Sequence, residues 1–158
     1  MKTLCVLLAT GMLSTLPALA APPAYLDDRS TATSLVKSFY NAVNRHEYAR
    51  AYSYFAPGAA PRPYAQFAAG YADTAAVKVA TGHEQSEGAA GSTYTTVPVA
   101  IDAVSANGRH SQFAGCYTTR LADPSIQDPP VVPMVIFSAK LHAARGGIRS
   151  LLGNCSAD

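Results

Sequence analysis

The spacing of hydrophobic residues changes once along this sequence, near residue 72, and this change limits the possible folds more than any other feature. Between residues 36 and 71, apolar side chains recur three and four positions apart, which puts them on one side of a helix. Between residues 77 and 141, apolar side chains alternate with polar or small ones, which is the pattern of strands. Helices followed by strands, rather than alternating with them, predict an α+β fold.

Three segments carry the helical pattern of apolar residues at i, i+3, i+4 and i+7. They are Val36, Phe39, Tyr40 and Val43, then Tyr48, Ala51, Tyr52 and Phe55, then Tyr64, Phe67, Ala68 and Tyr71. Asp28 or Ser30 is expected to cap the first helix, because either side chain can accept a hydrogen bond from a free backbone amide. Three prolines between residues 57 and 63 cannot continue a helix interior, so they separate the second helix from the third.

Four segments carry the alternating pattern of strands. They contain Val77, Val79 and Thr81, then Thr95, Val97, Val99 and Ile101, then Phe113 and Tyr117, then Val135, Phe137, Ala139 and Leu141. Asn107-Gly108 predicts a tight hairpin, and residues 87–91 predict a looser one, so the sheet is expected to be an antiparallel meander. Pro98 predicts an edge position or a bulge, because proline cannot donate to a neighbouring strand.

These elements predict three N-terminal helices packed on a curved four-stranded antiparallel sheet. Sheets twist, and a curved sheet with helices on its concave side encloses a cone-shaped cavity. The helix stripes and the inward face of the strands are expected to line it.

The N-terminus has the three parts of a secretory signal peptide. Lys2 is positively charged, residues 4–16 are mostly apolar, and residues 18–20 have the small-x-small pattern of a cleavage site. The apolar run is shorter than the roughly 20 residues that a membrane span needs. We therefore expect a signal peptide over 1–20, a flexible leader over 21–29, one domain over 30–143 and a C-terminal tail over 144–158. The location would be periplasmic or secreted, with no membrane span.

Removal of the signal peptide takes Cys5 away and leaves Cys116 and Cys155. An even pair of cysteines in an exported chain predicts a disulfide. The alternative is two free, buried thiols. Neither cysteine has histidines at metal-ligand spacing, so no metal site is expected.

The charge of the chain gives no reason to expect a nucleic-acid or membrane partner. Its formal net charge is +2, and only 14% of its residues are charged. Anionic partners need a concentrated positive patch, which scattered lysines and arginines do not provide. The sequence also lacks a nucleophilic-serine elbow and a phosphate-binding glycine loop, and no cofactor is expected.

Residues 35–52, LVKSFYNAVNRHEYARAY, resemble the start of nuclear-transport-factor-2-like domains, a superfamily that includes SnoaL-like and ketosteroid-isomerase-like proteins. The likeness is closest to the exported bacterial members. The segments 113–120 and 136–141 also resemble strands of that superfamily, and the resemblance covers most of residues 30–143. It implies the cone-shaped fold described above. It does not imply one activity, because this fold carries enzymes as well as non-catalytic binding domains.

Tyrosines on the helix stripes are the main candidates for lining a ligand pocket. Tyr40, Tyr52 and Tyr71 could present hydroxyl groups to a polar ligand, as could Tyr64. The alternative is that they are ordinary core aromatics whose hydroxyls reach the surface.

Catalytic candidates are weak. Ketosteroid isomerases, which the chain resembles in carrying Tyr40, need a carboxylate near the end of the second helix, but residues 54–63 contain no Asp or Glu. Dehydratases of the superfamily use a His with an Asp. His83 continues the parity of Thr81 and could face the cavity, with Asp73 or Asp102 as its partner. The neighbouring Glu84 would point to the opposite face.

The sequence favours an exported, non-catalytic pocket domain that binds a small apolar molecule or a partner protein. The first alternative is a small isomerase, cyclase or dehydratase that uses Tyr40 and His83. The second is a periplasmic interaction or inhibitor module that uses the open sheet face. A homodimer through the sheet would be compatible with any of the three.

We predict that the exported protein begins at Ala21. N-terminal sequencing of the product recovered outside the cytoplasm measures this directly. A mature form that keeps residues 1–20 would remove the basis for the predicted compartment.

Overall fold

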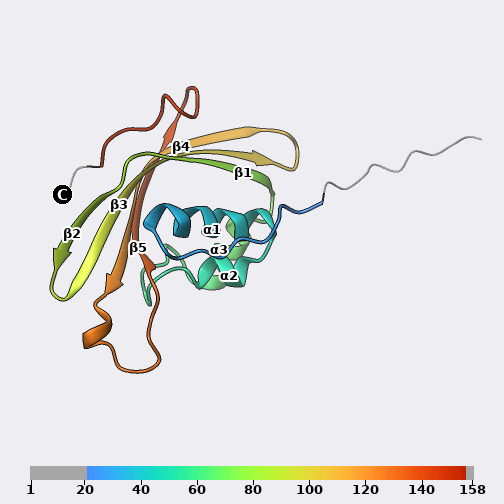
Figure 1. The fold of residues 1–158 in the computed structure, drawn as a ribbon. Coiled ribbons are helices and arrows are strands. Elements are labelled where there is room, and N and C mark those ends of the chain that lie inside the picture. Colours follow the sequence, from blue (N-terminus) through green and yellow to red (C-terminus); the bar gives the residue numbers. More distant parts are fainter. Residues whose placement is uncertain (1–20, 156–158) are drawn as a thin grey trace, which may run out of the picture.

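The computed structural model describes residues 21–155, so the predicted signal peptide lies outside the described residues. Three helices precede the sheet (Figure 1). The elements are α1 (Ala32–Asn44), α2 (Tyr48–Tyr52), α3 (Tyr64–Gly70), β1 (Thr74–Thr81), β2 (Gln85–Ala89), β3 (Ser92–Ser105), β4 (His110–Ala122), the 3-10 turn η1 (Pro124–Ile126) and β5 (Val135–Ala144). This order confirms the predicted α+β class.

The sheet is antiparallel, and it has five strands rather than the four that the pattern predicted. Its order is β1-β3-β4-β5, and β2 pairs with the other half of the long β3. The segment 87–91, predicted as a loose hairpin, is mostly strand, and the turn narrows to Ala90 and Gly91, which both have positive φ. The strand was missed because β2 is exposed along its whole length, so no buried face imposes alternation on it.

Pro98 explains why β1 and β2 are separate strands. Its carbonyl faces their edge, because it accepts a hydrogen bond from the Gly82 amide at 2.8 Å. A residue of an antiparallel strand points its N–H and C=O to the same side, so the donor that proline lacks falls on this edge. An edge position or a bulge was expected at Pro98. The break lies instead in the strands beside Pro98, where residues 82–84, between β1 and β2, leave the sheet.

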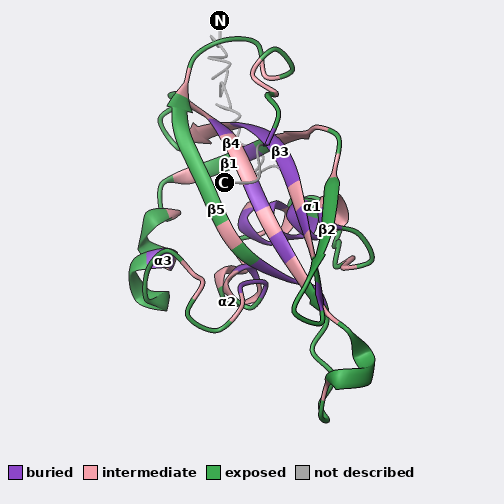
Figure 2. Cartoon of the chain, turned by 90° about the vertical axis from the view of Figure 1, so that its left-hand side faces the viewer, coloured by how far each residue is buried: buried purple, intermediate pink, exposed green. Residues whose placement is uncertain are grey.

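Helix α1 lies across the concave face of the sheet and contributes more of the buried core than any other element (Figure 1). Its buried positions include Leu35, Val36, Phe39 and Val43, each at most 1% exposed. They pack against inward residues of β3 and β4, where burial is concentrated (Figure 2). Each such side chain stabilises the fold by about 1.5–3 kcal/mol through removal from water.

The two ends of α1 are tied to the edge of the sheet by side chains. At the first turn, the Thr33 amide donates to Glu84, whose Oε1 is 2.6 Å away, and Thr31 accepts from Ser34. At the last residue, the Asn44 side chain exchanges two hydrogen bonds with the backbone of Val77. Glu84 can reach the helix because residues 82–84 have left the sheet.

The cap of α1 differs from the expectation of Asp28 or Ser30. Thr31 takes this position, and the Asp28 side chain accepts instead from the Ser30 amide. Glu84 could not be found from local sequence, because it lies 51 residues from the amide that it caps.

Residues 21–29, which we expected to be flexible, contact α1 and α2 without forming a helix or strand. The Leu26 carbonyl accepts from Arg50, and the Ala24 carbonyl accepts from Asn41. The Tyr25 ring lies 4.4 Å below the Arg50 guanidinium, a cation–π contact.

The C-terminal tail is joined to the sheet by a disulfide between Cys116 and Cys155. Cys116 neighbours Tyr117 in β4, whose side chain faces the helices, so Cys116 faces the other side. Ala100 and Ala114 are buried on that other side, in agreement with a covering by the tail. The predicted pairing is confirmed.

Replacing Glu84 with Ala should lower the free energy of unfolding by about 1 kcal/mol, because an amide of α1 loses its acceptor. Urea unfolding followed by circular dichroism measures the change. Glu87→Ala is the matched control, because Glu87 is an exposed acidic residue of β2. Equal effects of the two substitutions would contradict the capping role of Glu84.

Reduction of the disulfide should release the tail and leave the helices and strands in place. The closed loop spans 39 positions, and constraint of the unfolded chain then accounts for up to about 4 kcal/mol of stability. The Cys116→Ser/Cys155→Ser double variant should melt at the same lowered temperature as the reduced protein. Loss of the far-ultraviolet circular dichroism signal on reduction would mean that the bridge holds the domain rather than the tail.

Candidate functional site

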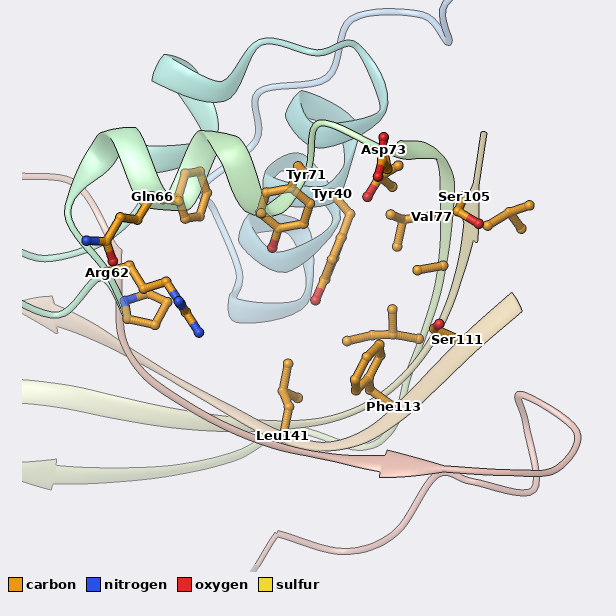
Figure 3. A pocket seen from close by; sticks show the side chains of 17 residues that line it. Tyr40, Arg62, Gln66, Tyr71, Asp73, Val77, Ser105, Ser111, Phe113 and Leu141 are labelled. Carbon is orange, nitrogen blue, oxygen red and sulfur yellow. The ribbon is translucent and has the colours of Figure 1, made fainter. Parts of the chain in front are cut away.

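A cavity of about 740 Å³ lies between the helices and the concave face of the sheet (Figure 3). Its walls are mostly apolar, with Phe67 from α3, Val77 from β1, Ile101 from β3, Phe113 from β4 and Leu141 from β5. The cavity is partly open to solvent. Its size and apolar lining are typical of small-molecule sites.

Two tyrosines form a hydrogen-bonded pair, of which Tyr40 lines the cavity. The hydroxyl oxygens of Tyr40, on α1, and Tyr117, on β4, are 2.7 Å apart. Both side chains are buried, with 4% and 2% of their surface exposed. Burial raises the pKa of Tyr40 and of Tyr117 well above the ordinary value, so both phenols stay protonated.

Tyr71 follows α3 and points its hydroxyl into the same cavity as Tyr40 (Figure 3). Its ring packs against Phe67 and stacks on Tyr48, with centroids 5.2 and 6.2 Å away. Burial raises the pKa of Tyr71 to about 12. The cavity therefore contains two phenol groups that remain hydrogen-bond donors at physiological pH.

The polar residues at the rim fall into two groups (Figure 3). Arg62 and Gln66 lie at the α3 end. Asp73, Ser105 and Ser111 lie at the opposite end, near the β3–β4 turn. The cavity thus has a positive and a negative end, separated by apolar walls and the two phenols.

The predicted ligand-binding residues are only partly brought together. Tyr40 and Tyr71 line the cavity, whereas Tyr52 packs against the rings of Tyr64 and Phe67 from outside it. His83 is exposed and does not line the cavity. The parity argument for His83 fails because the chain leaves the sheet at Gly82.

The suggested carboxylate partners of His83 are engaged elsewhere. Asp102 contacts His110 instead, with Nδ1 and Oδ1 2.9 Å apart on the exposed part of β3 and β4. Asp73 lines the cavity, and His83 does not. Within residues 21–155, His83 therefore makes no pair with Asp73 or Asp102.

Two residues of the site were not among the predicted ones. Tyr117 lies in a predicted strand, but its contact with Tyr40 joins residues 77 positions apart and has no local signal. Arg62 did have a signal, because it is the only charged residue between positions 51 and 72. A single charged residue in a mostly apolar segment is a signal for a binding group.

Within residues 21–155, no group of three His, Cys, Asp or Glu side chains is arranged to hold a metal ion. No helix in this described part is long and apolar enough to cross a membrane.

Comparison with known proteins gives one informative similarity. No family model and no curated protein matches the chain. A solved structure of a proposed dehydratase from the NTF2-like family of Streptomyces avermitilis aligns with 75% of this chain and 96% of its own length. The TM-score is 0.50, and the sequence identity is 11%. The chain has an NTF2-like fold, as the resemblance in sequence implied, and this similarity concerns the fold alone.

Stability should fall steeply above pH 10. The buried phenols of Tyr40 and Tyr117 have raised pKa values in the folded state, whereas they ionise near pH 10 once unfolded. Their contribution is complete below pH 10 and is lost above it, at about 1.4 kcal/mol per pH unit for each phenol. Urea unfolding at pH 8–12 measures the slope.

The Tyr40→Phe/Tyr117→Phe double variant should show a slope about 2.7 kcal/mol per pH unit shallower, because both phenols are gone. An unchanged slope in this variant would show that the two phenols already ionise in the folded protein.

Proposed function

We propose that this protein is an exported domain that binds a small apolar molecule in the cavity and does not transform it. The observation that carries the proposal is the cavity itself, which has apolar side chains from five elements and the phenol donors Tyr40 and Tyr71 in its lining. If the protein filled this space with its own core, larger side chains would be needed at lining positions such as Ala103 or Ser111. Export is part of the proposal because the disulfide suits an oxidising compartment.

Binding without catalysis is supported by the arrangement of the titratable groups. His83 lies outside the cavity, and the segment 54–63 has no carboxylate. The groups in the cavity can hold a polar atom of a ligand, since Tyr40 and Tyr71 are neutral donors. Acid–base catalysis needs a group that changes its protonation near the working pH, which these phenols do not.

One observation favours the alternative of an isomerase, cyclase or dehydratase. Asp73 lines the same cavity as Tyr40, so a carboxylate that could act as a base and a phenol that donates a hydrogen bond face the same ligand. The similar structure described above carries a proposed dehydratase activity in its own protein. Asp73 is exposed at the rim, however, and no histidine of residues 21–155 lines the cavity beside it.

A partner protein is the other alternative, and the outer face of the sheet is where it would bind. Tyr94 and Phe137 contact each other there, with ring centroids 5.3 Å apart, and Phe137 is 45% exposed. This pair also supports the suggestion of a homodimer through the sheet. An exposed aromatic pair is a smaller feature than the cavity, so we place ligand binding first.

Filling the cavity should abolish ligand binding. Ala103 lines it from β3, and Ala103→Phe would occupy the space of a ligand. Native mass spectrometry of the exported protein should show a bound small molecule that the variant lacks. Ala76→Phe, on the exposed side of β1, is the matched control and should retain the molecule.

Two outcomes would contradict the proposal. Equal retention of the molecule by both variants would place it outside the cavity. Recovery of an added ligand in chemically altered form, with loss of this turnover in Asp73→Asn, would establish the enzyme instead.

A further inference from the structure

We propose that the cavity selects an apolar molecule with one carboxylate group, and that Arg62, Tyr40 and Tyr71 bind this carboxylate. The inference rests on the proposed function, because it names the chemical class of the ligand. It follows from the direction of the hydrogen-bonding groups in the cavity, which are donors where a polar head group would lie.

The hydrogen bond between Tyr40 and Tyr117 uses one of their two hydroxyl protons, and the other proton can point into the cavity. Tyr117 does not line the cavity, and its hydroxyl has no other partner than Tyr40 among the described residues. Tyr117 therefore donates to Tyr40, because a buried hydroxyl proton without an acceptor is costly. The Tyr40 proton is then free to point at a ligand, and its donor strength increases because its oxygen already accepts a hydrogen bond.

Tyr71 adds a second donor. Within residues 21–155, its hydroxyl makes no hydrogen bond to another protein group, and it points into the cavity (Figure 3). Because its pKa is raised to about 12, the hydroxyl keeps its proton at physiological pH. Two protonated phenols that face one space favour an acceptor-rich group over a donor.

Arg62 supplies the positive charge that would attract a carboxylate. Among residues 21–155 it is the only cation that lines the cavity, and it has no ion pair there. Its backbone is restricted because it lies between Pro61 and Pro63. A guanidinium and hydroxyl donors match the two oxygens of a carboxylate, and one positive charge matches a single negative one.

The rest of the cavity sets the orientation of the ligand. Asp73 lies at the opposite end from Arg62 (Figure 3) and would repel a carboxylate there. Ile101, Phe113 and Leu141 form an apolar surface in between, on which a hydrocarbon can lie. An alkyl carboxylate would place its head group near Arg62 and its chain along these residues.

Isothermal titration calorimetry with three ten-carbon probes tests the inference on the exported protein. Decanoate, decan-1-ol and decylammonium share one chain and differ in their head group. We expect decanoate to bind at least tenfold more tightly than the other two. Arg62→Gln should weaken decanoate about tenfold and leave decan-1-ol unchanged, because a charge-assisted hydrogen bond contributes most of the selectivity.

Arg149→Gln is the matched control, since Arg149 is an exposed arginine of the tail outside the cavity, and decanoate affinity should not change. Tyr71→Phe should weaken the binding of decanoate about threefold or more.

Decan-1-ol or decylammonium binding as tightly as decanoate would overturn the head-group assignment and leave the cavity as a binding site. Equal effects of Arg62→Gln and Arg149→Gln would overturn the role of Arg62. Failure of all three probes to bind at millimolar concentration would instead contradict the proposed function.

Discussion

Helix α1 is fastened to one edge of the sheet at both ends, and the cavity depends on this attachment. Glu84 accepts from the amide of Thr33, and Asn44 bonds twice to the backbone of Val77. The apolar face of the helix would otherwise be free to settle more deeply onto the sheet, because hydrophobic packing has little directional preference. With both ends held, Tyr40 reaches Tyr117 and space remains beside them.

The class of fold and the interior positions could be predicted from the sequence, because both depend on the period of hydrophobic residues. The stripe of α1 is buried as expected. Strand β2 and the position of His83 could not be predicted this way. Pro98 of β3 has no N–H to donate to the strands beside it. The alternation of side chains between the two faces of the sheet is lost where residues 82–84 leave it. Contacts such as Glu84–Thr33 join distant positions, so no local pattern reports them.

The cavity was expected from the curvature of the sheet, but its chemistry emerged only from the arrangement of side chains. Tyr40 and Tyr71 were candidates that the structure brings together, whereas Tyr52 is directed elsewhere and His83 is exposed. His83, the predicted acid–base residue, does not line the cavity, whereas Arg62, which was not predicted, gives the cavity a positive end. These two differences are the reason that we propose recognition of an acceptor group on an apolar ligand rather than proton transfer.

Methyl nuclear magnetic resonance tests most directly whether the cavity is the binding site. Val77, Ile101 and Leu141 line the cavity, whereas Val131 and Ile126 lie in the exposed loop before β5. During titration with decanoate, the account predicts saturable shifts of the three cavity residues and none for the two loop residues. Saturable shifts confined to Val131 and Ile126 would contradict it, because the ligand would then bind the surface loop rather than the cavity.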